Sequence, residues 1–181
     1  VLDALRVTVV DRVGWEADDI IATVATRAEA DGHDVIIVTG DRDSYQLVRD
    51  PHVRVLYNKR GVSDYSLYDE AGIQEKTGVT PELYPQYAAL RGDPSDNLPG
   101  VPGVGEKTAS KLIVTWGSLD TLYEHIDEVV PEKLRPLLEE HREGVLESRK
   151  LMRLVRDVDV MLDPERGRVG EYDREAVVRL F

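Results

Sequence analysis

Three short clusters of carboxylates are the residues of this sequence whose types and spacing could do chemistry. They are Glu16-Ala17-Asp18-Asp19, Asp41-Arg42-Asp43 and Asp93-Pro94-Ser95-Asp96. Each cluster alone has an ordinary structural explanation, since acids favour helix starts and Asp and Ser favour turns. Their joint placement instead predicts a shared cation site. The candidate catalytic and metal-binding residues are Glu16, Asp18, Asp19, Asp41, Asp43, Asp93 and Asp96.

The absence of His and Cys from these clusters indicates which cations they would hold. Carboxylate oxygens are hard ligands, which select Mg²⁺ or Mn²⁺ over zinc. Carboxylates drawn into one crevice raise one another's pKa unless a cation neutralises them. Two ions roughly 4 Å apart suit phosphodiester hydrolysis, because one generates hydroxide and both stabilise the attacking and leaving oxygens. We therefore expect two or more Mg²⁺ or Mn²⁺ ions.

The elements that must position these acids begin as alternating strands and helices. Apolar residues recur at helical spacing over residues 16–30, and the β-branched run 35–38 is typical of a strand covered on both faces. Further strands are expected at 7–10 and 53–57, with a short helix at 45–48. In an open parallel sheet the ligand crevice lies beyond the carboxyl ends of the strands, where the first two clusters fall.

The later part of the chain is predicted to be helical. We expect helices over residues 67–77, 81–90, 106–115, 118–125, 132–141, 145–155 and 175–181. The chain thus divides into an α/β part over 1–58 and a helical region over 59–181.

A Gly- and Pro-rich motif over residues 98–113 has the pattern of a helix-hairpin-helix. Gly103 and Gly105 permit a tight turn and close approach of a DNA backbone. The amides of Glu106 and Lys107 would enter the next helix and could bind a phosphate. Lys111 adds charge, and Thr108 lies in the same first turn. A flexible linker is the alternative, but a single copy that leads directly into a helix speaks against it.

Composition bounds the remaining possibilities. The 181 residues carry 23 Lys and Arg against 35 Asp and Glu, a net charge of −12. This balance argues against a charge-driven nucleic-acid binder unless metal ions offset the acids of the site. The lack of Cys excludes disulfides and thiolate zinc sites and fits a reducing interior. No apolar run approaches the ~20 residues that span a bilayer, so we expect no membrane role.

Together, the motifs resemble the 5′ nuclease domain of bacterial DNA polymerase I, within the flap endonuclease superfamily. The matching stretches, in order, are the cluster at 16–19, Thr39-Gly-Asp41-Arg-Asp43-Ser-Tyr-Gln-Leu, Leu90-Arg-Gly-Asp93-Pro-Ser-Asp96-Asn-Leu-Pro-Gly, and Val101-Pro-Gly-Val-Gly-Glu-Lys-Thr-Ala109. The resemblance covers residues 5–181. It implies a PIN-like α/β sheet followed by a helical region that carries a helix-3-turn-helix element.

The resemblance also implies an activity and its setting. The family members are 5′→3′ exonucleases and structure-specific flap endonucleases that act on 5′ flaps, nicked or gapped duplexes and RNA primer strands. They serve DNA replication and repair in the bacterial cytoplasm, and a polymerase domain could share the parent chain.

Residue roles follow from the same resemblance. Glu16, Asp18, Asp19 and Asp41 correspond to ligands of a first metal region, and Asp43, Asp93 and Asp96 to ligands of a second. The family's hairpin holds a K⁺ through backbone carbonyls, which here would be those of Val101 and Val104. Gly103, Gly105, Glu106, Lys107, Thr108 and Lys111 would contact the duplex.

The chain departs from the family at its start, where Val1 is not an initiator residue. The family begins with two strands that each carry a metal-binding Asp, followed by a helical arch. We expect these parts to be absent and therefore expect little or no cleavage by this polypeptide alone. The alternatives are a non-catalytic duplex DNA-binding module and a PIN-type ribonuclease, which usually lacks the Gly103-Val104-Gly105 hairpin.

Overall fold

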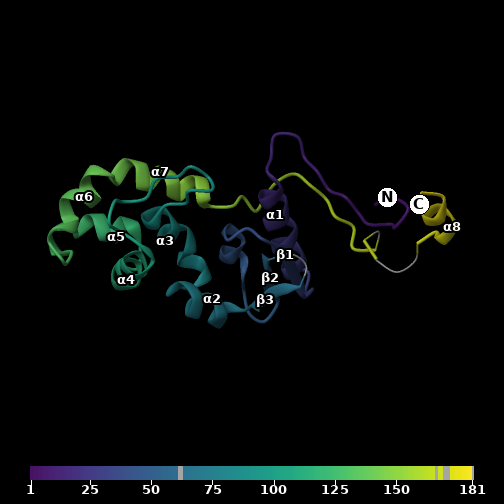
Figure 1. Ribbon diagram of the computed structural model, residues 1–181, viewed down its shortest axis with the longest axis horizontal. Coiled ribbons are helices and arrows are strands. Elements are labelled where there is room, and N and C mark those ends of the chain that lie inside the picture. Colours follow the sequence, from purple (N-terminus) through teal and green to yellow (C-terminus); the bar gives the residue numbers. More distant parts are fainter. Residues whose placement is uncertain (61–62, 166, 169–171, 181) are drawn as a thin grey trace.

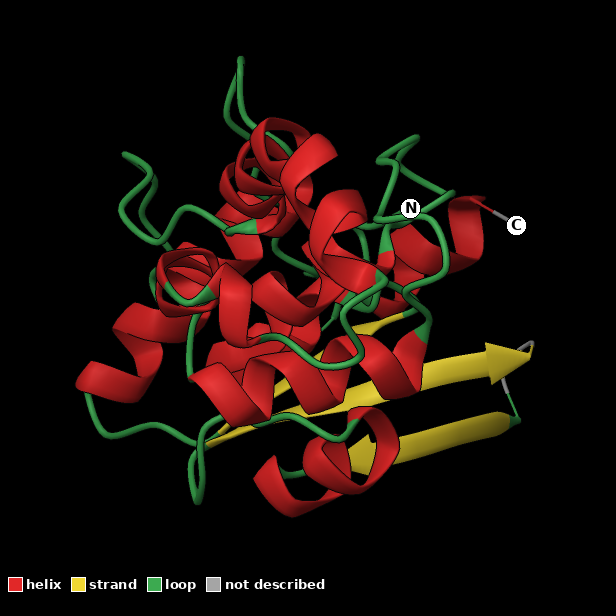
Figure 2. Ribbon diagram, turned by 90° about the vertical axis from the view of Figure 1, so that its left-hand side faces the viewer, coloured by secondary structure: helices red, strands yellow, loops and turns green. Residues whose placement is uncertain are grey.

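The computed structural model describes residues 1–60, 63–165, 167–168 and 172–180 of the chain. One part combines a small sheet with helices α1 and α2, and a second part consists of helices α3 to α7 (Figure 1). In Figure 2, where the helical part faces the viewer, the strands run together on one side of the molecule. The α/β part followed by a helical part agrees with the predicted fold class.

Helix α1 (Ala17–Ala30) forms where the apolar spacing predicts it. Its first turn contains Asp18 and Asp19, which interact favourably with the positive end of the helix dipole. The side chains of Ile20, Ala22, Thr23 and Ala25 are buried. The helix therefore holds its acidic start beside the sheet while its apolar face packs on the core.

The sheet has the order β1-β2-β3 and mixed direction. Strand β1 (Val35–Thr39) runs parallel to β2 (Val53–Arg60), with Val35 opposite Val53 and Thr39 opposite Tyr57. Both strands were predicted. Strand β3 (Asp64–Tyr68) pairs antiparallel with β2, so the expected start of a helix at residue 67 is wrong.

Helix α2 (Glu70–Thr77) begins only after β3 has ended. The Asp69 carboxylate caps it by accepting a hydrogen bond from the Gly72 amide at 2.8 Å. Gly78 ends the helix in the left-handed conformation, at φ 80°. The cap and the strand pairing together move the helix start past the position that hydrophobic spacing indicates.

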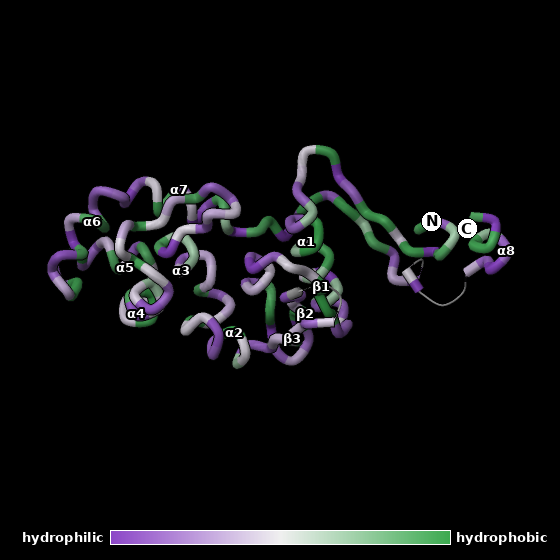
Figure 3. Tube along the Cα trace, in the orientation of Figure 1, coloured by the Kyte–Doolittle hydropathy of each residue, from purple (hydrophilic) through white to green (hydrophobic). Residues whose placement is uncertain are grey.

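The strand predicted at residues 7–10 does not form. Within the described residues this segment is extended but pairs with no strand, and it runs away from the sheet (Figures 1 and 3). Val10 instead packs against a small cluster of Ile20, Val158 and Val160. A β-branched run needs a partner strand to become part of a sheet, and sequence alone does not supply the partner.

The chain after residue 80 contains the expected helices with shifted ends, and residue 181, the expected end of the last helix, lies outside the described residues. Their bounds are α3 (Tyr84–Arg91), preceded by a 3₁₀ turn η2 (Pro81–Leu83), α4 (Glu106–Trp116), α5 (Leu119–Glu124), η3 (Ile126–Glu128), α6 (Leu134–Glu140), α7 (Arg142–Met152) and α8 (Arg174–Leu180). Helix α3 packs against both α4 and α7. It therefore forms the centre of the helical part.

A cluster of tyrosines joins the two parts of the core. Tyr45 lies in the 3₁₀ helix η1 (Asp43–Leu47), which follows β1, and is completely buried. Its ring centroid is 5.4 Å from that of Tyr57, 5.5 Å from that of Tyr68 and 5.4 Å from that of Tyr84 in α3. The loop after β1 is thus fixed against α3.

In the described part of the chain, no helix has the length and apolarity needed to cross a lipid bilayer.

Candidate functional site

Acidic side chains from three separate segments lie within electrostatic range of one another. Asp18 belongs to the first turn of α1, and Asp41 and Asp43 follow the carboxyl end of β1. Asp93 and Asp96 belong to the loop that follows α3. The tertiary fold brings these segments, which are far apart in the sequence, close enough for their charges to interact, and we call them the acidic cluster.

Burial and mutual repulsion raise the pKa of three of these carboxyls. Burial raises the pKa of Asp43 to about 7, and the charges of Asp41, Asp96, Asp93 and Asp18 add to the rise. The pKa of Asp18 is raised by burial and then by Asp41, Glu16, Asp19 and Asp96. The pKa of Asp96 is raised by burial and then by Asp93, Asp41 and Glu16. Negative charge is therefore concentrated where these three segments meet.

The loop after β1 has a defined local geometry. The Asp41 amide donates to the Thr39 hydroxyl at 2.9 Å, and one carboxylate oxygen of Asp41 accepts the Asp43 amide at 2.8 Å. This second contact is a side-chain turn in which Asp41 holds the backbone that presents Asp43. Asp41 thus has a structural function, because it holds the turn, and it also belongs to the acidic cluster.

Two predicted ligands also make contacts that hold the fold together. Asp19 accepts a hydrogen bond from the Val155 amide at 2.9 Å. One oxygen of Asp93 accepts the Ser95 amide at 3.0 Å and also contacts the Ser95 hydroxyl, and the other accepts the Arg91 guanidinium at 3.0 Å. The contact of Asp19 with Val155 joins residues 136 positions apart, which no local pattern connects. Arg91 lies only two residues before Asp93 and inside a recognised motif, but its residue type alone did not indicate this pairing.

The donor set suits a hard divalent cation, since it consists of carboxylate oxygens whose mutual repulsion a cation would relieve. The residues that the structure describes contain no group of three or more His, Cys, Asp or Glu side chains placed to hold one ion. The chemistry of the acidic cluster therefore fits a hard divalent cation, while the described side chains are neighbours rather than a closed coordination sphere.

The hairpin before α4 forms as a tight turn. The Val104 amide donates to the Val101 carbonyl at 2.9 Å, and both valine side chains are buried, with 3% and 4% of their surface exposed. Gly103 adopts φ 80°, a left-handed conformation that favours glycine. The carbonyls of Val101 and Val104 therefore belong to a backbone turn whose side chains are anchored in the core.

Gly105 has a different reason to lack a side chain. It caps α4 in an extended conformation, at φ −89°, and a Cβ added there would meet no atom within 4 Å. Nothing within the fold requires glycine at this position. The open space lies next to the amides of Glu106 and Lys107 at the start of α4. These N–H groups have no acceptor within the helix, so they are available to a ligand. An incoming backbone could therefore approach closely.

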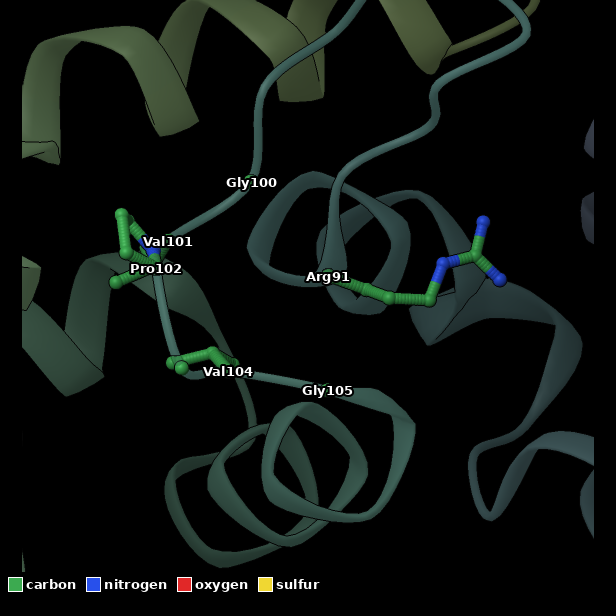
Figure 4. Close-up of a pocket in the computed structure, with 7 residues that line it drawn as sticks. Arg91, Gly100, Val101, Pro102, Val104 and Gly105 are labelled. Carbon is green, nitrogen blue, oxygen red and sulfur yellow. The ribbon is translucent and has the colours of Figure 1, made fainter.

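A pocket of about 490 Å³ lies along this hairpin (Figure 4). It is lined by Arg91 and by the hairpin residues Gly100, Val101, Pro102, Gly103, Val104 and Gly105. A second cavity, of about 310 Å³, lies on the other part of α4 beside Lys107, Lys111 and Trp116. Lys107 and Lys111 are both exposed, and Thr108 is half-buried. The cationic residues named from the sequence thus border an accessible surface.

The acid loop and the hairpin contact each other backbone to backbone. Gly92 adopts φ 82°, and a Cβ there would lie 2.3 Å from the Gly100 nitrogen. Asp93 and Leu98 exchange two backbone hydrogen bonds, each 2.9 Å long. The loop that carries Asp93 and Asp96 is therefore held at a fixed separation from the hairpin.

Comparison with protein families gives two matches, which together cover residues 1–175. Residues 1–78 match the family described as 5′-3′ exonuclease, N-terminal resolvase-like domain. Residues 79–175 match the family described as 5′-3′ exonuclease, C-terminal SAM fold.

Curated relatives agree with the family matches. DNA polymerase I of Mycobacterium tuberculosis strain H37Rv is 50% identical over 181 residues, which are 100% of this chain and 20% of that protein. DNA polymerase I of Bacillus caldotenax is 44% identical over 180 residues, or 99% of this chain and 20% of that protein. The chain therefore spans about a fifth of the length of these relatives.

Solved structures show the same fold at low sequence identity. T5 5′-exonuclease with zinc bound superimposes with a TM-score of 0.68 at 23% identity, over 77% of this chain and 50% of that one. The catalytic core of Rad2 in complex with DNA substrate gives a TM-score of 0.60 at 16% identity, over 99% of this chain and 58% of that one.

Proposed function

The chain belongs to the 5′-3′ exonuclease family, and from this premise we propose that it works as part of a metal-dependent 5′ nuclease. The proposed reaction is hydrolysis of phosphodiester bonds at 5′ ends and 5′ flaps of branched DNA. The single observation that carries the proposal is the convergence of three acidic segments, where burial and the neighbouring carboxylates raise the pKa of Asp18, Asp43 and Asp96. These segments adjoin a hairpin in which Gly105 leaves room for a backbone to approach.

The carboxylates would divide between two metal regions. We assign Glu16, Asp18, Asp19 and Asp41 to the first and Asp43, Asp93 and Asp96 to the second. When bound, Mg²⁺ or Mn²⁺ would supply a water of lowered pKa and stabilise the attacking and leaving oxygens. The residues of the chain would hold the ions, and the contacts of Asp93 with Arg91 and Ser95 would keep its carboxylate in one orientation.

The hairpin would bind the duplex part of the substrate. Gly103 shapes the turn, Gly105 leaves room for the sugar-phosphate backbone, and the amides of Glu106 and Lys107 would donate to a phosphate. Thr108 and Lys111 lie next along the same helix. The carbonyls of Val101 and Val104 are the proposed ligands of a K⁺ that would bridge the turn to the phosphate.

The proposal extends to the setting of the reaction. The relatives are bacterial DNA polymerases, so the whole protein would pair this part with a polymerase domain and act in the cytoplasm. Suitable substrates would be 5′ flaps, nicked or gapped duplexes and RNA primer strands. Each of these structures presents a 5′ end next to a duplex.

The test is cleavage of a 5′-flap oligonucleotide in the presence of Mg²⁺ or Mn²⁺. In a full-length version of the protein, replacing Asp93 and Asp96 by Ala should abolish cleavage and leave duplex binding intact, because the hairpin does not depend on these carboxylates for its charge. Unchanged turnover would contradict the assignment. We expect slow or no cleavage by the 181-residue chain and faster cleavage by a version extended at its amino end. Equal rates would contradict that expectation.

A second function, binding of duplex DNA without cleavage, is favoured by one observation. The hairpin is fully formed, whereas the described residues provide no group of three or more side chains placed around one ion. A salt titration with Mg²⁺ present separates the two functions if binding and product are followed together. Salt-sensitive binding without product would support the binding module.

A further inference from the structure

Arg91 is the last residue of α3, and its charged group is largely buried beside Asp93 of the acidic cluster. Its side chain is 12% exposed. The guanidinium donates to Oδ2 of Asp93 at 3.0 Å, its Nε donates to the Gly92 carbonyl at 3.0 Å, and it lies 5.4 Å from the centroid of the Tyr87 ring. These contacts lie on three sides of the planar group and fix its orientation.

The Asp93 carboxylate is held from both of its oxygens. Oδ2 accepts the guanidinium, and Oδ1 accepts the Ser95 amide at 3.0 Å. The side chain of Asp93 is as buried as that of Arg91, at 12% exposure. A buried carboxylate without a partner is strongly unfavourable, so the guanidinium stabilises the Asp93 side chain in this position.

Arg91 also reaches the helix that follows the hairpin. One guanidinium nitrogen lies 4.0 Å from Oε1 of Glu106, the first residue of α4. The Arg42 guanidinium approaches the same oxygen from the other side, at 3.9 Å. Arg42 stands between Asp41 and Asp43, so Glu106 contacts cations from both acid-bearing segments.

We propose that Arg91 is a positioning residue that orients the Asp93 carboxylate in the acidic cluster. Through Glu106, Arg91 also sets the position of Asp93 relative to the hairpin. The proposal rests on the nuclease function proposed above. Arg91 would touch neither the substrate nor the ions. It would act by holding one predicted metal ligand, Asp93, at a fixed position relative to the first residue of α4.

A purely structural function of Arg91 predicts a different result. Loss of its packing would lower stability but would leave cation binding by the folded protein unchanged. Arg135 provides a matched control, because its side chain is partly buried, its Nε donates to the Val129 carbonyl at 2.8 Å, and it pairs with Glu132 at 4.0 Å. Arg135 lies in α6, which carries none of the residues of the acidic cluster.

The experiment compares Arg91→Met, Arg91→Lys and Arg135→Met in the full chain. Mn²⁺ binding is measured from the electron paramagnetic resonance of the free ion, DNA binding from the anisotropy of a labelled 5′-flap duplex, and stability from thermal unfolding. Loss of a group that orients a metal ligand typically weakens metal binding about 10- to 100-fold. We expect such weakening in Arg91→Met, partial recovery in Arg91→Lys and no change in Arg135→Met.

Where the wild-type protein cleaves the flap, single-turnover rates add a second readout. Arg91→Met should lower the maximal rate much more than it changes the DNA concentration for half-maximal rate. Equal Mn²⁺ affinity and equal rates in Arg91→Met and Arg135→Met would overturn the proposal.

A structural arm keeps the test independent of catalysis. In a crystal structure of Arg91→Met, we expect the Asp93 side chain to leave its present rotamer and Glu106 to turn away from α3. An unmoved Asp93 would overturn the positioning function. Failure of the version extended at its amino end to cleave any flap would instead contradict the proposed nuclease function, while the position of Asp93 in the variant would still decide the positioning function.

Discussion

The carboxylate of Asp19 accepts a hydrogen bond from the backbone amide of Val155 at 2.9 Å, across 136 positions of sequence. The neighbouring Thr23 hydroxyl accepts the Val158 amide at 3.2 Å. Two side chains of α1 therefore hold the segment that follows α7. A residue assigned to the metal site on resemblance thus also connects the two parts of the fold.

Replacing Asp19 by Ala should lower the free energy of unfolding by about 1–3 kcal/mol, because the partly buried Val155 amide loses its acceptor. Asp19→Asn keeps an acceptor oxygen and should cost less stability, while it removes the negative charge. Urea unfolding and Mn²⁺ binding, measured on both variants, separate the two functions. Equal losses of stability in the Ala and Asn variants would contradict this division.

Protonation of Asp43 should make the metal-free protein more stable as the pH falls from about 8 to about 5. The pKa of Asp43 is about 7 in the fold against an ordinary 3.8, so the folded state binds this proton more tightly than the unfolded state. The stabilisation is complete below the ordinary pKa and is lost as the pH rises through about 7. Thermal unfolding in EDTA at a series of pH values measures it.

Asp43→Asn is the control for this pH dependence. It should flatten the curve without abolishing it, because the pKa values of Asp18 and Asp96 are also raised. Added Mg²⁺ should raise the unfolding temperature more at pH 8 than at pH 5, since the ion competes with protons for the same oxygens. A wild-type curve that rises with pH over this range would contradict the prediction.

The two hairpin glycines should respond differently to Ala. Gly103→Ala forces a side chain into the left-handed region, which costs about 1–2 kcal/mol of stability. Gly105→Ala meets no atom of the fold and should leave stability unchanged, but its methyl group would occupy the space left for a DNA backbone. Thermal unfolding and duplex anisotropy measure both effects. Wild-type DNA affinity in Gly105→Ala would argue against this approach path.

Lys107→Ala and Lys111→Ala should each weaken duplex binding and reduce its salt dependence. Each phosphate contact contributes about 0.9 to the slope of log K against log salt concentration, so each substitution should lower the slope by about that amount. Lys76→Ala is the control, because Lys76 is exposed on α2 and lies over the Tyr68 ring. An equal change of slope in all three variants would contradict a localised interface.

Local patterns predicted the elements whose residues carry their own signals. The apolar spacing of α1, the β-branched run of β1 and the glycines before α4 each specify a conformation over a short stretch. The motifs that contain the acids were recognisable for the same reason. The geometry of Gly103 also follows directly from its residue type.

Features that depend on a distant partner could not be read in the same way. Residues 7–10 look like a strand but have no strand beside them, and residue 67 looks helical but pairs with β2. The contact of Arg91 with Glu106 and that of Asp19 with Val155 depend on how α3, α4 and α1 pack. These contacts decide the geometry of the candidate site, so its composition was predictable and its internal connections were not.

The backbone contact between Gly92 and Gly100 has a consequence for anyone who redesigns this molecule. A methyl group at either glycine would clash with the backbone, since its nearest backbone atom would lie only 2.3 Å away. The clash would force the loop that carries Asp93 and Asp96 away from the hairpin. The proposed cleavage and the proposed DNA binding would then be lost together, and substitutions at these two positions could not change one without damaging the other.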